Sequence, residues 1–285
     1  MQSKKVSRRN ILKWGSATVV GGLLGEGLIE PNRLEHVAIS VPIKDLPASF
    51  EGFKIGILSD IHWGHAIDSK FMKMCCDSVM AFKPDLMVVP GDFLHGIDRH
   101  TRTRPRLEGV IESLDSPHGV LGVLGNHDHW TGKSYAIDQV HTHSRVQLID
   151  NQGVMLERNG GLLAVGGVGD LWEDKVELDK AFKGVSPDTP RILLSHNPDV
   201  AEFVEHDPGT RVDLQISGHT HGGQFVLPGI YDATCRVSHY GSKFNHGLVN
   251  GKRNRVYVTK GVGRPHGIRL FAPPDVTCLT LTRAA

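Results

Sequence analysis

Runs of apolar and β-branched residues recur along the chain from residue 54 onward. The run at 54–59 is apolar over most of its length, which is typical of a buried strand. An amphipathic segment at 69–82, closed by Pro84, predicts a helix. Further strand-like runs lie at 86–90, 119–124, 162–165, 191–194, 214–216, 256–259 and 276–281. Strands separated by helical segments predict an α/β domain, and this number of strands predicts two sheets.

The amino-terminal segment differs from the rest of the chain. Its apolar stretch at 14–24 contains glycine and is shorter than the ~20 residues of a transmembrane helix. We therefore predict a signal or anchor segment at 1–30 and a single domain at 31–285. The segment carries two acidic residues, Glu26 and Glu30, and five basic ones, namely Lys4, Lys5, Arg8, Arg9 and Lys13.

The basic residues form a pattern that resembles a known export signal. The sequence at 7–13, Ser-Arg-Arg-Asn-Ile-Leu-Lys, resembles the twin-arginine signal S-R-R-x-F-L-K, with Ile11 in place of phenylalanine. The resemblance implies passage through the twin-arginine export machinery to the periplasm, the cell wall or the outer face of the membrane. No A-x-A cleavage site precedes Pro31, so an uncleaved leader could also associate with the membrane. The alternative is a flexible basic tail.

Charge and composition narrow the function of the remaining chain. Of the 32 basic and 31 acidic residues, 27 and 29 lie after residue 30, which makes this part nearly neutral. A neutral surface is not expected to bind nucleic acid strongly. The four cysteines have no C-x-x-C spacing, so we expect neither a disulfide framework nor a thiolate metal site. The 17 histidines favour metal binding or acid–base chemistry.

Polar side chains follow five of the predicted strands where each strand ends. Open α/β sheets place their ligand sites at this edge, so we expect these side chains to meet. Within Asp-x-His and His-x-His, an alternating backbone sends both side chains to the same side. Adjacent glycines allow sharp turns and leave room for an ion. The five blocks are Asp60-Ile61-His62, Gly91-Asp92, Gly125-Asn126-His127-Asp128, Ser195-His196-Asn197 and Gly218-His219-Thr220-His221.

Together these blocks resemble the calcineurin-like metallophosphoesterase family between residues 54 and 281. The resemblance implies a four-layer α/β/β/α sandwich with two mixed sheets and a dinuclear metal site at the sheet edge. It places Asp92 as a bridge between two ions. The sequences at 196–199 (His-Asn-Pro-Asp) and 218–224 (Gly-His-Thr-His-Gly-Gly-Gln), with the leader, resemble the bacterial exported phosphodiesterase branch. One ion would be held by Asp60, His62, Asp92 and His221, and the other by Asp92, Asn126, His196 and His219.

Two cations at this site would suit phosphoester hydrolysis. They lower the pKa of a bridging water, giving a metal-bridging hydroxide, and neutralise the phosphate oxygens. Oxygen and nitrogen ligands suit two divalent ions per chain, with manganese, iron or zinc expected. By resemblance, His127 protonates the leaving group, an effect worth ~10²–10⁴ in rate. The alternative is that His127 supports its loop by hydrogen bonding.

The sequence departs from the family beside His127. Many relatives carry G-D-x-x-D, whose second aspartate orients the catalytic histidine, and here that position is His95. Asp128 or Asp98 could take its place, or His127 could be less firmly oriented.

Two basic clusters flank the motifs and could contact a substrate. They lie at 99–106 and 252–269, and most of their members are expected to be solvated. Arg264 and Arg269, beside the turn containing Gly261 and Gly263, are the predicted substrate-binding exceptions, because guanidinium groups pair well with phosphates. No arginine or lysine lies within the motif blocks, so we expect phosphodiesters to be preferred over dianionic monoesters.

Several functions compete. The first is an exported, metal-dependent phosphodiesterase acting on a phosphodiester or pyrophosphate, either a small molecule or lipid-linked. The second is a pyrophosphatase of the UDP-2,3-diacylglucosamine type at the membrane surface, although such an enzyme normally faces the cytoplasm and the export signal disfavours it. The third is a catalytically silent, metal-stabilised envelope-binding protein, which would not need His127. A nuclease is disfavoured by the neutral charge.

Overall fold

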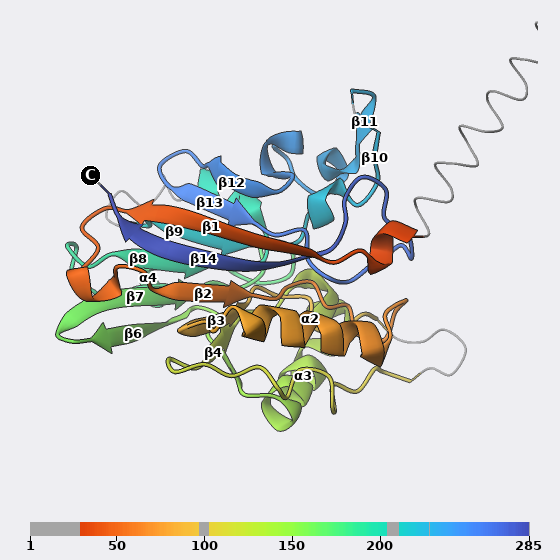
Figure 1. Ribbon diagram of the computed structural model, residues 1–285, viewed down its shortest axis with the longest axis horizontal. Helices are drawn as coiled ribbons and strands as arrows, with labels where there is room; N and C mark the ends of the chain where they lie inside the picture. The colour runs from red at the N-terminus through yellow and green to blue at the C-terminus, as the bar shows by residue number, and fades with distance from the viewer. Residues whose placement is uncertain (1–28, 97–102, 204–210, 228, 285) are drawn as a thin grey trace, which may run out of the picture.

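The computed structural model describes residues 29–96, 103–203, 211–227 and 229–284. Within these ranges the chain forms two six-stranded sheets and a small hairpin (Figure 1). The first sheet has the order β1-β14-β2-β3-β4-β5 and the second β12-β13-β9-β8-β7-β6. The first contains β1 (Glu35–Ile43), β2 (Lys54–Ile57), β3 (Leu86–Val89), β4 (Val120–Gly122), β5 (Val146–Leu148) and β14 (Asp275–Arg283). The second contains β6 (Gln152–Arg158), β7 (Gly161–Gly167), β8 (Arg191–Leu194), β9 (Leu214–Ser217), β12 (Gly247–Asn250) and β13 (Arg255–Val258).

Helices and the hairpin complete the described structure. The hairpin projects from the body of the molecule (Figure 1) and pairs β10 (Val226–Leu227) with β11 (Tyr231–Asp232). The α-helices are α2 (Ser69–Ala81), α3 (Asn126–His143) and α4 (Leu178–Ala181). The 3-10 helices are η1 (Glu30–Asn32), η2 (Ala48–Phe50), η3 (Pro198–Glu202), η5 (His221–Gly223), η6 (Ala233–Arg236) and η7 (Gly241–Phe244).

Both sheets are mixed, but the strands that precede the motifs are parallel. In the first sheet β2, β3, β4 and β5 pair in parallel, and β14 joins β2 antiparallel. In the second sheet β7, β8, β9 and β13 pair in parallel, with β6 and β12 antiparallel at the edges. Parallel strands end at a common edge, so the residues after β2, β3, β8 and β9 lie near one another.

The core shows why the sheets stack. Alternation along β3 sends Leu86 and Val88 into the cluster between the two sheets, where they meet Ile192 and Leu214 of the second sheet. Met87, the intervening residue, joins a second cluster against α2 and α3. The outer face of the second sheet packs on α4 and η3. The predicted α/β/β/α arrangement is confirmed, although the outer layer on the second sheet consists of short helices.

All eight predicted strands coincide with observed ones, and the predicted helix at 69–82 is α2. Its first turn is capped by Asp68, whose side chain accepts a hydrogen bond from the N–H of Phe71 at 2.8 Å. The edge strands β1, β5, β6 and β12 and the helix α3 were not predicted. In β1 most positions alternate between exposed and half-buried, so the strand carries no continuous apolar run.

The described residues include no helix with the length and apolar character needed to cross a bilayer. Cys75, Cys76, Cys235 and Cys278, which all lie within the described ranges, are free thiols. Arg8, Arg9, Asp98, Arg99 and Arg102 lie outside the described residues.

Candidate metal centre

The seven predicted ligands come together at the carboxyl edge of the two sheets. Each is almost fully buried, with at most 6% of its surface exposed. Asp60, His62 and His221 form one group whose ligand atoms lie within 4.8 Å of one another. Asp60, Asp92 and His196 form a second such group. Residues separated by up to 161 positions in sequence, from Asp60 to His221, are therefore neighbours in space.

Asp92 lies between the two groups. Its Oδ2 is 3.3 Å from Nε2 of His62 and 3.3 Å from Nε2 of His196. On the His196 side, Oδ1 of Asn126 lies 3.2 Å from Nε2 of His196 and 3.0 Å from Nδ1 of His219. This position of Asp92 fits the expected bridging carboxylate.

The backbone at the ligands is unusual. Asp60, His62, Asp92, His219 and His221 have φ angles of 51°, 49°, 55°, 70° and 53°. Non-glycine residues seldom adopt this left-handed conformation, which costs on the order of 1–3 kcal/mol each and clusters at functional sites. The glycines of the motifs make room for the carboxylates: a Cβ atom at Gly125 would overlap Asp92, and one at Gly218 would overlap Asp60.

Hydrogen bonds select which nitrogen of two histidines faces the cluster. Nδ1 of His196 donates to the carbonyl of Pro90 at 2.8 Å, leaving Nε2 free. Nε2 of His219 lies 3.1 Å from the carbonyl of Val237, which leaves Nδ1 free. Asp199, from the His-Asn-Pro-Asp block, holds the segment that contains Val237 by accepting hydrogen bonds from Ser238 and His239. Such partners orient metal-binding imidazoles.

Burial also controls the charges. It lowers the pKa of His62 and His221, and it lowers that of His219 to about 3, so these imidazoles are in the neutral form that binds metals. Burial raises the pKa of Asp60 to about 6, and its Oδ2 has no hydrogen-bond partner among the described residues. Burial acts in the same direction on Asp92, but His196 and His62 outweigh it and hold the pKa of Asp92 well below its usual value.

These features fit a pair of divalent cations. Two buried carboxylates, one with a free oxygen, need positive charge nearby, because an unpaired buried carboxylate is costly. The remaining donors are an amide oxygen and four imidazole nitrogens, a set that suits transition metals.

His127 lies at the mouth of the cluster, in the first turn of α3. Its imidazole is half-buried, and burial lowers its pKa. The ring lies 4.6 Å from that of His62 and stacks on His95 at 4.5 Å with an interplanar angle of 26°. Asp128 does not take the place of the missing aspartate: it accepts hydrogen bonds from the N–H groups of Phe93, Leu94 and Gly125. Asp128 therefore holds two loops together.

A cavity of about 400 Å³ opens above the ligands. Its floor is formed by Asp92, Asn126, His219 and His221, and His127 lines it between this floor and the rim. Its rim, defined here as Trp130, Trp172, Phe225 and Ile268, is 38–50% exposed and apolar. Arg236 and His266 also line it. Sequence reasoning missed the rim, because these residues are scattered among four segments and share no periodic pattern.

The two predicted substrate-binding arginines lie elsewhere. Arg269 is fully buried and donates to the carbonyls of Lys260, Gly261, Gly263 and Ala272 at 2.5–3.1 Å. Its Nη2 lies 3.2 Å from Nδ1 of His221, behind the ligands. A substrate cannot reach it, so Arg269 supports His221 and its loop instead.

Arg264 lies outside the cavity. Its guanidinium donates to the Asn32 side chain at 3.1 Å and packs over the ring of Phe71. It lines a separate shallow cavity with Trp63, Asp68 and Pro105. These contacts place Arg264 away from the ligand cluster, so they do not support the substrate-binding role predicted for it.

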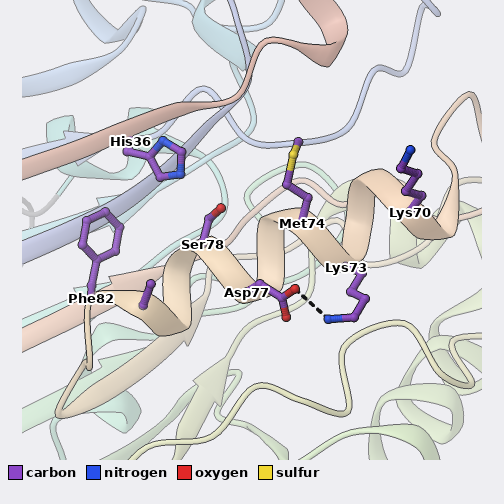
Figure 2. Close-up of a pocket in the computed structure, with 8 residues that line it drawn as sticks. His36, Lys70, Lys73, Met74, Asp77, Ser78 and Phe82 are labelled. Carbon is purple, nitrogen blue, oxygen red and sulfur yellow. Dashed lines mark hydrogen bonds and ion pairs between the residues drawn. The ribbon is translucent and has the colours of Figure 1, made fainter.

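Another groove lies on the outer face of α2 (Figure 2). It runs between α2 and His36 of β1, and its charged residues include Lys73 and Asp77, which form an ion pair at 2.6 Å. None of the predicted site residues lines it.

Comparison with known proteins identifies the class of enzyme. The model of the calcineurin-like phosphoesterase family matches residues 53–223. The chain belongs to this family, and it is a metal-dependent phosphoester hydrolase.

Its similar relatives span nearly the whole chain. The uncharacterized metallophosphoesterase YkuE of Bacillus subtilis is 29% identical over 98% of this chain and 98% of its own. The phosphodiesterase YaeI of Escherichia coli is 27% identical over 97% of this chain and 99% of its own. The UDP-2,3-diacylglucosamine pyrophosphatase LpxG of Chlamydia muridarum is 26% identical over 87% of this chain and 89% of its own.

Proposed function

We propose that this protein is an exported phosphodiesterase that uses two manganese, iron or zinc ions. The observation that carries the proposal is the position of Asp92, with Oδ2 at 3.3 Å from a histidine nitrogen of each ligand group. When bound, such an ion pair lowers the pKa of an attacking water and neutralises the phosphate. The similarity to the phosphodiesterase YaeI supports the proposal.

The chain's own residues would divide the remaining work. His127 is the half-buried imidazole beside the ligands, placed to hold a proton at the mouth of the cavity and transfer it to the leaving-group oxygen. The ligands are at most 6% exposed, and such low exposure to water strengthens electrostatic interactions with the phosphate. The rim would contact the organic groups that are esterified to the phosphate.

The cavity favours a diester over a monoester. Among the described lining residues, Arg236 is the one that is always positively charged, and the rim is apolar. A dianionic monoester would gain from several fixed cations near the phosphate, whereas a diester carries one charge and has a second group that the rim can contact.

The test compares two substrates on full-length protein reconstituted with Mn²⁺. We expect bis-p-nitrophenyl phosphate to be cleaved with a higher kcat/KM than p-nitrophenyl phosphate. A preference for the monoester would contradict the proposal. Tight metal binding with no hydrolysis of any phosphoester would instead favour a silent, metal-stabilised envelope-binding protein.

A second candidate is a nucleotide-lipid pyrophosphatase at the membrane surface. The apolar rim favours it, because an acyl group near the phosphate could lie against Trp130, Trp172 and Phe225. The similarity to LpxG gives further support. Cleavage of a UDP-linked diacyl sugar with a kcat/KM at least tenfold above that of bis-p-nitrophenyl phosphate would favour this candidate.

Export is the part of the proposal that rests on the leader alone. Twin-arginine export carries folded proteins, which suits an enzyme that acquires metals before it leaves the cytoplasm. Replacing Arg8 and Arg9 by lysine should retain the protein inside the cell with its activity intact, as measured by fractionation. Unchanged localisation of this variant would show that the twin-arginine motif is not an export signal. It would favour the alternative of a cytoplasmic lipid pyrophosphatase.

A further inference from the structure

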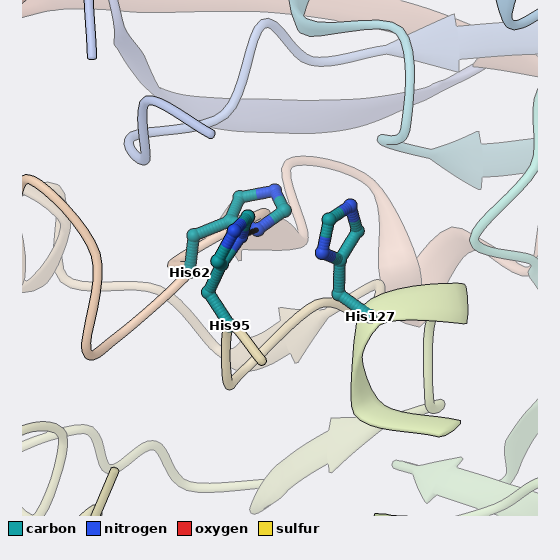
Figure 3. Close-up of side chains that lie close together, drawn as sticks. All are labelled: His62, His95 and His127. Carbon is teal, nitrogen blue, oxygen red and sulfur yellow. Dashed lines mark hydrogen bonds between the residues drawn. The ribbon is translucent and has the colours of Figure 1, made fainter. Parts of the chain in front are cut away.

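His95 stands where many family members have an aspartate, and it contacts both a ligand and the proposed acid (Figure 3). The three imidazoles come from different elements: His62 follows β2, His95 lies in the loop after β3, and His127 lies in the first turn of α3. Nδ1 of His95 is 3.0 Å from Nδ1 of His62. The ring of His95 stacks on His127 at 4.5 Å.

The short distance between two Nδ1 atoms fixes how protons are shared. Two nitrogens at 3.0 Å form a hydrogen bond only if one of them carries the proton. Nε2 of His62 faces Asp92 and His221, at 3.3 and 2.9 Å, and must be free of its proton to bind an ion. With an ion bound at Nε2, the proton of His62 would therefore lie on Nδ1, and His95 would accept it.

Stacking holds the His95 ring from both sides. His65 packs on it at 4.5 Å with an interplanar angle of 23°, and His127 packs on it at 4.5 Å with an angle of 26°. The imidazole of His127 contacts the rings of His95, His62 and Trp130, and these contacts orient it.

We propose that His95 is a positioning residue with two separable roles. As a neutral acceptor it holds His62 with Nε2 towards the ion site, and as a flat ring it holds the imidazole of His127. The second role rests on the proposed phosphodiesterase function, whereas the first concerns metal binding alone. A carboxylate at this position would form a charge-assisted hydrogen bond with His62 of roughly twice the strength. His95 is therefore a weaker hydrogen-bond partner for His62 than an aspartate would be.

Two substitutions separate the roles. His95→Asn keeps an acceptor but removes the ring, and His95→Phe keeps a ring but removes the acceptor. His65→Phe serves as the matched control, because it changes an imidazole in the same stack and preserves stacking. Thermal melting of each metal-free protein checks that the variants fold.

The first measurement is metal retention, made by elemental analysis of full-length Mn²⁺-loaded protein after dialysis against increasing chelator. Removing a partner that orients a metal-binding histidine typically lowers affinity ~10–100-fold. We expect a loss in that range for His95→Phe, with His95→Asn and His65→Phe within about threefold of wild type.

The second measurement is the dependence of kcat on the leaving group at saturating Mn²⁺. A good leaving group such as p-nitrophenolate needs little protonation, whereas an alkoxide needs the acid. We expect His95→Asn to lose about tenfold or more on an alkyl phosphodiester and much less on bis-p-nitrophenyl phosphate. His95→Phe should keep the wild-type ratio between the two substrates.

Three results would overturn the proposal. The first is wild-type metal retention in His95→Phe, or an equal loss in His65→Phe, which would remove the hydrogen-bond role. The second is an unchanged leaving-group dependence in His95→Asn. The last is an additional ion, beyond the expected two, that the wild type binds and both His95 variants lose, because His95 would then be a metal ligand. A wild-type protein that binds ions but cleaves no diester would contradict the proposed function. In that case metal retention in His95→Phe would still test the hydrogen bond between His95 and His62.

Discussion

The seven ligands, four of which form the floor of the cavity, are polar and at most 6% exposed, whereas the four rim residues are apolar and 38–50% exposed. Buried polar groups are costly unless they are paired, so the floor is constrained to residues that an ion or a hydrogen bond can satisfy. Exposed apolar residues carry no such constraint, and many different side chains would be tolerated at the rim. The floor therefore defines the reaction class, and the rim is the part free to define the substrate.

The largest effect is expected for a substitution in the floor, at Asp92. Asp92→Asn should lose both ions and at least about 10⁴-fold in kcat/KM, because the neutral amide cannot offset the repulsion between two cations. Elemental analysis and kinetics on bis-p-nitrophenyl phosphate measure this. Asp77→Asn, an exposed carboxylate on α2, is the control and should behave as wild type. Retention of two ions by Asp92→Asn would remove the bridging role.

His127 lies at the boundary between floor and rim, so its loss should separate chemistry from metal binding. His127→Ala should keep both ions while kcat for an alkyl diester falls about 10²- to 10³-fold, as expected when a general acid is removed. Metal content and kcat are measured on the same preparation. If metal is lost in parallel with activity, His127 is a ligand or a structural residue.

Behind the floor, Arg269 should matter for stability rather than for substrate affinity. Arg269→Met leaves buried carbonyls without donors, so we expect the free energy of unfolding of the metal-free protein to fall by about 3 kcal/mol. Chemical denaturation measures the change. Arg264→Met, in which the replaced group is half-exposed, should lose less than about 1 kcal/mol. A raised KM with unchanged stability in Arg269→Met would restore its predicted contact with substrate.

The smallest effect is expected at the rim. Phe225→Ala should raise KM for bis-p-nitrophenyl phosphate by about fivefold with kcat unchanged, which corresponds to roughly 1 kcal/mol of aromatic contact. Phe271→Ala is the matched control, because Phe271 is also exposed but does not line the cavity. Equal effects of the two substitutions would show that the rim does not contact the substrate.

The sequence by itself determined the sheets and the candidate ligands. Strands buried on both faces consist mainly of apolar residues, so β2, β3 and β8 were visible in the pattern, as was β9 despite its buried Gln215 and Ser217. The polar blocks that follow these strands stood out by contrast. The family followed from the same blocks. Edge strands such as β1 escaped prediction, because their exposed positions relax the apolar pattern.

Only the tertiary structure decided how side chains from distant segments face one another. Arg269 reads in sequence as a basic residue near a glycine turn, yet the carbonyls folded around it make it a buried support for His221. His95 reads as the loss of an aspartate, yet the approach of the loop after β3 to the segment after β2 brings it to His62. The rim likewise gathers Trp130, Trp172 and Phe225 from separate segments. Hydrophobic periodicity records burial along one element, whereas these contacts depend on packing between elements that are far apart in the chain.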